Sequence, residues 1–532
     1  MRIHLTRWLT IPLVLLVYLG LVACGGGGGG GETQLPGLNN PPANQPPVNQ
    51  PPANPPPAPT LAAVNDTYTW LGNSRINVPA VNGVLANDTL ATGIATFQNP
   101  STQGGSVAIA ADGSFSYEPP APTAAGAFSG TDTFTYTASA ADGSTAQGTV
   151  TMTITQVAWY VMNNFVGTGV GTSTAPFTNL AAASAASGPG QTIFVFAGDG
   201  TMLGQNNGID LLPNQRLLGQ GVGLTFDVLP ADPTNTLLPV SGVATTTATP
   251  AALPVIGDTV NIIDNLPIIG LASGVEVAGV IVDGAGTLAN MNGLSGINID
   301  GFNIHDNAIR TLPRAGIQLG GTSSGTGSIM NNTLTGLTGP NPDNAIDLVT
   351  TAANVVFTVS ANTLSNVTET GIRVQYESGT VQVTGNQLTN VGTAAGRRGI
   401  DVEGAGTAGI TGNSVNNSAG NPVARSGIQV NANGTLAARV NNNSVSNATP
   451  ADGGVQAQTT LLTSNLCLQM RGNSSDTVMV LDNRATGNTP ANFRIEGPLQ
   501  ADFEGANTGT FSYLQNVNAV AFVAVGTCGF AP

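Results

Sequence analysis

Asn332-Thr-Leu334 is followed along this chain by Asn362-Thr-Leu364, Asn386-Gln-Leu388, Asn413-Ser-Val415 and Asn443-Ser-Val445. Phe302-Asn-Ile304 opens this series with Phe in the Asn position. A second series falls between these motifs: Ile317-Gln-Leu319, Ile346-Asp-Leu348, Ile372-Arg-Val374, Ile400-Asp-Val402, Ile428-Gln-Val430 and Val455-Gln-Ala457. Two series with one shared period of between 24 and 30 residues indicate the stacked, nearly equivalent turns of a solenoid.

Each repeat contains short alternating strands between Gly and Asn turns, without helical periodicity. This pattern predicts an all-β fold with a parallel β-helix over residues 157–465, closed by a C-terminal β cap over residues 466–532. An Asn at the same turn of every coil predicts a buried ladder of amides that satisfies turn carbonyls, a structural role without a ligand.

The second series also predicts where polar side chains gather outside the solenoid. In an Ile-x-Val strand the aliphatic residues point inward and the central residue points outward, so stacking aligns the central residues about 4.8 Å apart. One predicted row holds Gln318, Asp347, Arg373, Asp401, Gln429 and Gln456. Two residues further along, a parallel row holds Gln375, Glu403, Asn431 and Gln458.

Five of these residues form the candidate ligand-binding site: Asp347, Arg373, Gln375, Asp401 and Glu403. In one interpretation its carboxylates, about 5–10 Å apart, act as acid and base on a glycosidic bond. In the other, the face is solvated and Arg373 pairs with both Asp347 and Asp401, which keeps both ionised and unsuited to proton transfer. We favour the second interpretation and assign no catalytic residue.

The composition limits the partners of this chain. Only 8% of its 532 residues are charged, all 14 basic residues are Arg, and the net charge is −15. This charge argues against nucleic acid and disfavours acidic polysaccharides unless cations bridge them. No sequence pattern of a metal site, nucleotide site or other cofactor site is found.

The N-terminus resembles a bacterial lipoprotein signal peptide. Arg2 and Arg7 precede an apolar run that ends in Leu21-Val-Ala-Cys24, which is similar to a lipobox. The resemblance implies a signal peptide over residues 1–23, a membrane anchor through lipidated Cys24 and, with Gly25 after it, sorting to the outer membrane. Residues 24–59 are rich in Gly and Pro and predict a disordered tether.

Residues 60–156 predict a separate β-sandwich. Alternating strands are expected at residues 67–70, 106–109, 114–117, 133–136 and 149–154. Val84-Leu-Ala-Asn-Asp88 and Gly130-Thr-Asp-Thr-Phe-Thr-Tyr136 resemble bacterial Ig-like and cadherin-like modules, which mostly act as spacers. The cadherin-type resemblance leaves calcium open at Asp66, Asp88 and Asp132, but we favour turn-stabilising roles.

The start of the solenoid resembles the amino-terminal cap of pectin-lyase-like β-helices on bacterial surface proteins. The similar segments are Trp159-Tyr-Val161, Gly169–Phe177, a helix-like stretch over residues 179–187 and Gln191-Thr-Ile-Phe-Val-Phe196. The resemblance implies a right-handed β-helix whose wall binds or cleaves polysaccharide. The catalytic motifs of pectate lyases and polygalacturonases are absent, and no Lys is present to act as the neutralising residue of lyases.

Two cysteines remain, Cys467 and Cys528, and in an exported protein we expect them to form a disulfide. Together these features predict a lipid-anchored surface protein for adhesion or glycan binding, without catalysis, whose partners are polysaccharide or a host or neighbouring cell surface. A polysaccharide lyase or glycoside hydrolase acting on the solenoid wall is the alternative, and a purely structural envelope protein is the third.

Overall fold

The computed structural model describes residues 59–226, 236–238, 253–260, 266–287, 290–338, 343–448, 453–461, 463–483, 489–497, 499–514 and 520–529. The predicted signal peptide, Cys24 and the Gly/Pro-rich segment up to residue 58 lie outside these ranges. In the described part, no helix has both the length and the apolar character needed to cross a membrane.

The first domain is the predicted Ig-like sandwich of two sheets. Its strands are β1 (Asp66–Gly72), β2 (Ile76–Val78), β3 (Gly93–Phe97), β4 (Ser106–Ile109), β5 (Phe115–Glu118), β6 (Gly130–Ser139) and β7 (Thr145–Val161). One sheet is the antiparallel β2-β5-β4, and the other places β7 between β1 and β6, with β3 beyond β6. β1 runs parallel to β7. Alternating inward residues, among them Trp70, Phe134 and Tyr136, form the core.

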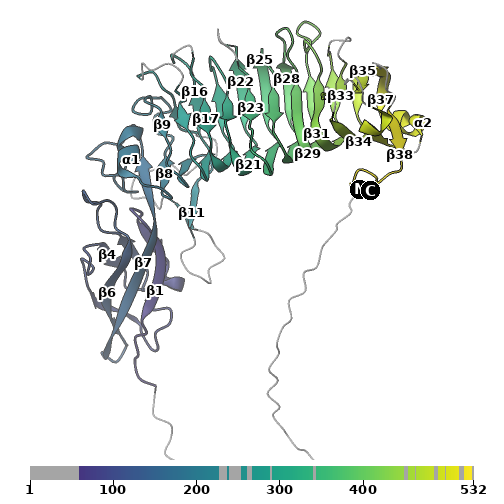
Figure 1. The fold of residues 1–532 in the computed structure, drawn as a ribbon. Coiled ribbons are helices and arrows are strands. Elements are labelled where there is room, and N and C mark those ends of the chain that lie inside the picture. The colour runs from purple at the N-terminus through teal and green to yellow at the C-terminus, as the bar shows by residue number, and fades with distance from the viewer. Residues whose placement is uncertain are drawn as a thin grey trace, which may run out of the picture. The chain divides into compact units, whose positions relative to one another are not determined.

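The Ig-like domain and the β-helix share strand β7 (Figure 1). The first part of β7 pairs with β6, whereas Ala158–Val161 pairs with β8 (Thr192–Val195) of the β-helix. The buried Tyr160 hydroxyl lies 2.5 Å from Ser74 Oγ, and Tyr160, Phe194 and Phe196 pack in one cluster with the Ig-like core. The two domains are therefore joined by a strand and a shared apolar core.

The β-helix has three walls of parallel strands, here called A, B and C (Figure 1). Wall A contains β9 (Ile209–Asp210), β14 (Ile269–Gly270), β17 (Leu294–Ile297), β20 (Ile317–Gly320), β23 (Ile346–Val349), β26 (Ile372–Gln375), the first halves of β29 (Ile400–Thr411) and β31 (Ile428–Asn441), β33 (Val455–Thr459) and the end of β35 (Ser474–Asn483).

Walls B and C complete each coil. Wall B contains the end of β7, β8, β10 (Arg216–Gly219), β15 (Val275–Ala278), β18 (Asp300–His305), β21 (Ser324–Met330), β24 (Val355–Ser360), β27 (Gly379–Thr384), the second halves of β29 and β31, β34 (Asn465–Arg471), β36 (Phe493–Glu496) and β38 (Ala521–Val523). Wall C contains β13 (Val255–Ile256), β16 (Ile281–Asp283), β19 (Ala308–Arg310), β22 (Thr333–Leu337), β25 (Thr363–Val367), β28 (Gln387–Val391), β30 (Ser414–Asn416), β32 (Ser444–Ser446) and the start of β35.

The remaining elements lie beside these walls. The helix-like stretch of the sequence is α1 (Leu180–Ala186), capped by Asn179, whose side chain accepts a hydrogen bond from the Ala182 amide. β11 (Leu224–Phe226) and β12 (Thr236–Leu238) form an antiparallel pair. After α2 (Gln500–Gly505), β37 (Thr508–Leu514) pairs with β35.

The predicted asparagine ladder runs through the turns between walls B and C. Each buried amide donates to the side-chain oxygen of the next Asn and to a wall-B carbonyl, as Asn386 does to Asn413 Oδ1 and Val359 O, both at 2.9 Å. The ladder contains Asn307, Asn332, Asn362, Asn386, Asn413, Asn443, Asn473 and Asn507. The placement of Phe302 in this series is wrong, because Phe302 lies in wall B opposite Gly327 and Asn307 holds the first ladder position.

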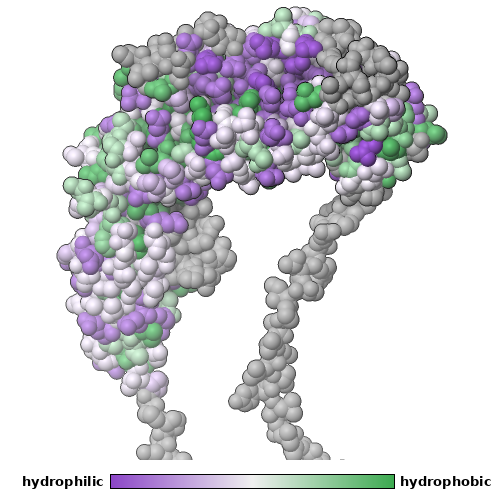
Figure 2. Space-filling model, in the orientation of Figure 1, coloured by the Kyte–Doolittle hydropathy of each residue, from purple (hydrophilic) through white to green (hydrophobic). Residues whose placement is uncertain are grey.

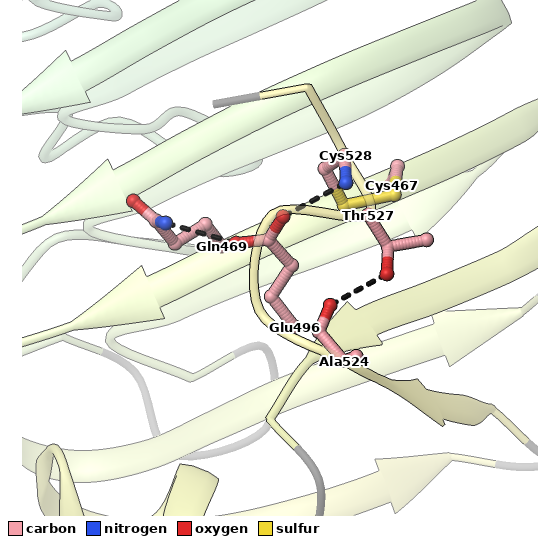
Figure 3. The surroundings of a disulfide bond; sticks show 6 residues. All are labelled: Cys467, Gln469, Glu496, Ala524, Thr527 and Cys528. Carbon is pink, nitrogen blue, oxygen red and sulfur yellow. Dashed lines mark hydrogen bonds between the residues drawn. A yellow bond between two sulfur atoms is a disulfide. The ribbon is translucent and has the colours of Figure 1, made fainter. Parts of the chain in front are cut away.

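Parallel pairing continues past residue 465, where the sequence pattern loses its period. β34 to β38 extend the walls, and the predicted Cys467–Cys528 disulfide links β34 to the chain after β38. The buried Glu496 side chain accepts hydrogen bonds from the Cys528 amide at 2.8 Å and from Gln469 Nε2 at 2.9 Å (Figure 3). The last part of the described chain is thus bonded to two wall-B strands.

Candidate functional site

The two predicted polar rows lie in register on wall A. Asp347 pairs with Arg373 and Arg373 pairs with Asp401, while Gln375 pairs with Glu403. Gln318 precedes this series, and Gln429 and Gln456 extend it. The structure therefore brings the five candidate residues together on three consecutive strands, β23, β26 and β29.

The expectation of a fully solvated face is wrong. Asp347 is 6% exposed, and both Gln429 and Gln456 are 1% exposed. The reason is that residues of the turns between walls C and A fold over the rows: Asn344 Nδ2 donates to Asp347 Oδ1 at 3.0 Å, and Ser426 Oγ donates to Gln456 Oε1 at 2.9 Å. We call the outward side of wall A, which these turns border along one edge, the wall-A groove.

Charged side chains concentrate along the wall-A groove. Four of the eight ion pairs between described residues lie on it or on the turns that border it: Arg314–Asp343, Arg373–Asp347, Arg397–Glu369 and Arg398–Asp401. Figure 2 shows hydrophilic side chains gathered over the middle coils of the β-helix in the face presented there. Of the other four pairs, three lie on wall B or directly after its strand β18 and one lies on wall C, so this group distinguishes wall A and its turns mainly from the hydroxyl-rich strands of wall C.

Arg373 does not bridge the two aspartates as expected. Its guanidinium lies 3.7 Å from Asp347 and donates a hydrogen bond to Gln375 Oε1 at 2.7 Å. Asp401 instead pairs with Arg398 at 3.1 Å and accepts a hydrogen bond from Asn431 at 3.3 Å. Sequence reasoning missed Arg398, although its position three residues before Asp401 in the turn into β29 was a usable signal.

The carboxylates of the groove are harder to ionise than ordinary ones. Burial raises the pKa of Asp347, against the lowering effects of Arg373 and Asn344. Burial likewise raises the pKa of Asp401, opposed by Arg398 and Arg373. Burial and the nearby Asp401 raise the pKa of Glu403. We expected Arg373 to keep both aspartates ionised; in the structure Arg373 does lower both pKa values, but burial raises them by more.

The three aspartates considered for calcium lie in the Ig-like domain. Asp132 is buried and accepts hydrogen bonds from Tyr117 Oη at 2.7 Å and Thr102 Oγ1 at 3.0 Å, so it fixes the neighbouring turn. Asp88 accepts from Tyr136 Oη, whereas Asp66 Oδ2 is buried without a hydrogen-bond partner. Among the described residues, no group of three or more His, Cys, Asp or Glu side chains is arranged to hold a metal ion.

We expect Asp66→Asn to stabilise the Ig-like domain at high pH. Burial and the neighbouring Asp88 raise the pKa of Asp66 to about 7, so ionisation of Asp66 opposes folding. Below the unfolded pKa of about 4, Asp66 is neutral in both the folded and the unfolded chain and does not oppose folding. As the pH rises from about 4 to about 7, the unfolded chain ionises Asp66 more readily than the folded domain does, so the free energy of unfolding falls. Above that pH the variant should gain on the order of 2–4 kcal/mol in unfolding free energy.

Denaturant unfolding of both proteins at pH 5 and pH 8 checks this expectation. The exposed Asp142→Asn is the matched control and should leave the pH dependence unchanged. If the free energy of unfolding falls by the same amount from pH 5 to pH 8 in wild type and in Asp66→Asn, Asp66 does not cause this pH dependence.

Comparison with known proteins agrees with the N-terminal Ig-like domain. The family model of the bacterial Ig domain matches residues 49–153. A GH136 lacto-N-biosidase from Eubacterium ramulus is 11% identical over 69% of this chain and 68% of its own, with a TM-score of 0.26. A family 28 exopolygalacturonase from Yersinia enterocolitica is 11% identical over 76% of this chain and 86% of its own, with a TM-score of 0.21.

Because the identities and TM-scores of both structures are low, neither likeness bears on the activity of this chain. No curated protein sequence matches it. The family match and the strand pairing together show a bacterial Ig domain at residues 49–153 that is followed by a parallel β-helix.

Proposed function

We propose that this protein binds a neutral glycan in the wall-A groove and displays that groove at the cell surface. The observation that carries the proposal is the group of four ion pairs between Arg and carboxylate side chains on wall A and on the turns that border it, in a charge-poor β-helix. Side chains that are fixed by partners and still partly exposed, such as Arg373 beside Gln375 and Asp347, offer preoriented hydrogen-bonding groups.

The chemistry of the groove favours a neutral ligand. Its Arg side chains are already matched by carboxylates, so little uncompensated positive charge is left for an acidic polymer. Ile297 and Val349, at outward positions of β17 and β23, lie beside the polar rows, and Ile297 is 69% exposed. Polar groups next to an apolar surface suit sugars, which have hydroxyl edges and C–H faces.

Surface display belongs to the same proposal. The lipobox-like sequence ending at Cys24 supports attachment to the outer membrane, and the Gly/Pro-rich segment after it supports separation of the β-helix from the lipid. In this arrangement the Ig domain and β-helix face outward, toward polysaccharide of a host or neighbouring cell.

Arg373→Ala should weaken glycan binding at least about tenfold, because it removes a donor and leaves Asp347 without its cationic partner. The chain from residue 25 onward is tested for retention on neutral and acidic polysaccharides, and released oligosaccharides are measured in the same samples. Arg310→Ala is the matched control, since Arg310 pairs with Asp283 on wall C. Equal binding by wild type and Arg373→Ala would exclude this groove.

Hydrolysis of the bound glycan is the second candidate function, favoured by the arrangement of Asp401 and Glu403. Both lie on the outward side of β29, two residues and thus about 6.6 Å apart along the strand, a spacing typical of inverting glycosidases. Burial raises the pKa of both, as a general acid requires. Product release that disappears in Asp401→Asn and Glu403→Gln, with binding retained, would establish it; binding without products would reject it.

A further inference from the structure

The polar row of wall A extends to the first strand of that wall. Asp210 of β9 pairs with Gly270, Gly270 with Ser295, and Ser295 with Gln318, which precedes Asp347. Asp210 is thus the outward residue at the start of the row that holds Asp347 and Asp401. Six coil spacings separate Asp210 from Asp401, about 29 Å in total.

A cavity lies at this end of the row. It has a volume of about 360 Å³ and is bordered by Ser184 and Ala185 of α1, Asp210 of β9, and Leu266 and Pro267. Small-ligand sites begin at about 300 Å³, so the cavity is large enough for one small ligand. Asp210, Asp258, Asn207 and Ser184 provide polar groups to its lining, and Leu266 and Pro267 provide apolar ones.

Gly270 leaves room for the Asp210 carboxylate on the sheet. A Cβ atom at residue 270 would lie 2.1 Å from Asp210 Oδ1, closer than any real contact. The carboxylate therefore leans over the next strand of the row. Gly270 and Ser295 are the smallest residues of the row, so between Asp210 and Gln318 the row itself carries no large side chain.

Helix α1 closes the other side of the cavity. β9 pairs only with β14 among the described strands, so no described strand continues wall A beyond it, and α1 packs against β9 at that point. A linear ligand that lies along the row therefore reaches the last described strand of the wall beside α1.

We infer that the wall-A groove binds the end of a linear neutral glycan, with its terminal sugar in the cavity between α1 and β9. This inference rests on the proposed glycan-binding function. Asp210 accepts hydrogen bonds from two neighbouring hydroxyls of the terminal sugar, because a carboxylate offers two acceptor oxygens. Leu266 and Pro267 pack against its C–H face, and the following sugars lie over Ser295 and Gln318 toward Arg373.

Chain-end binding is tested with a neutral polysaccharide that the chain from residue 25 onward retains, out of barley β-glucan, arabinoxylan, galactomannan and amylose. The polysaccharide is cut by partial acid hydrolysis, and bound protein per gram is measured at saturation. We expect the capacity to rise in proportion to the number of chain ends. A capacity per gram that stays constant would overturn the inference.

Two variants test the cavity itself by calorimetric titration with the resulting oligosaccharides. Asp210→Asn removes the charged acceptor, and Ala185→Trp fills the cavity from an exposed position on α1; both should bind at least about tenfold more weakly. Asp300→Asn, at an exposed carboxylate of wall B, is the control and should bind like wild type. Equal thermal unfolding of all three variants and wild type verifies their folding.

The outcomes separate this inference from the function on which it rests. If Arg373→Ala weakens binding while Asp210→Asn and Ala185→Trp bind like wild type, the groove binds glycan but the terminal cavity does not take part. If Arg373→Ala has no effect, or no polysaccharide is retained, both the proposed function and chain-end binding are overturned.

Discussion

Asn386→Ala should lower the free energy of unfolding by about 4 kcal/mol or more. The fully buried Asn386 side chain accepts from the backbone and side-chain amides of Asn362, both at 3.0 Å, and donates to Val359 O and Asn413 Oδ1. Alanine leaves the Asn362 backbone N–H and Val359 O without these partners, and each orphaned polar group costs about 1–3 kcal/mol. Asn362 Nδ2 and Asn413 Oδ1 each lose one of their hydrogen bonds. Because every rung of the ladder contacts the next, the loss should loosen several coils together.

Denaturant unfolding followed by far-ultraviolet circular dichroism measures this change. Gln387→Ala is a matched control at the next residue, where the side chain points outward from wall C, and it should stay within about 0.5 kcal/mol of wild type. If the two variants unfold alike, the ladder contributes no more than ordinary strand pairing, and the origin of coil stability has to be sought in the aliphatic core.

Removal of the disulfide should destabilise the C-terminal coils by about 4 kcal/mol. Cys467 and Cys528 are 61 residues apart, and the loss of this loop closure frees the unfolded chain by about that amount in the chain-entropy model. Cys467→Ala combined with Cys528→Ser also removes the constraint that keeps the Cys528 amide on the buried Glu496 (Figure 3). Limited proteolysis should then cut after β36 under conditions in which wild type resists.

Wild type treated with a reductant is the first control and should unfold at the same denaturant concentration as the double variant. Asn386→Ala without reductant is the second, since its damage lies in the middle coils and the C-terminal segment should remain protected longer. Resistance of the double variant to proteolysis would mean that strand pairing alone holds β38.

The two series of repeated motifs predicted the coils well, because each repeated position meets one physical requirement of the fold. Ile372 and Val374 must face the core, and Asn386 must satisfy buried turn carbonyls, so both positions recur with the coil. Phe302 was misassigned because spacing alone placed it in the Asn series, while the hydrogen bonds identify Asn307. Beyond residue 465 the ladder continues with Asn473, at a regular separation of 30 residues, and with Asn507, whose separation of 34 residues lies outside the range of the earlier steps.

The candidate site was only partly predictable for a related reason. Register followed from strand pairing, so the neighbours Asp347, Arg373 and Asp401 were expected on one wall. The burial of these side chains could not be predicted from strand pairing, because it depends on how turns of unequal length fold over that wall. Arg398 and Asn344 come from such turns, whose sequences do not repeat, and they decide which carboxylates are paired and how strongly each is shielded from water.

The strand shared by the two domains determines how the molecule carries mechanical force. β1 and β7 are parallel and pair over seven residues, from Asp66 with Val150 to Gly72 with Val157. A pull between residue 59 and the β-helix acts on the start of β1 and the end of β7, in opposite directions along both strands. Such shear strains all hydrogen bonds of the pair at once instead of opening them one by one, so the Ig domain resists tension that would unzip an antiparallel hairpin.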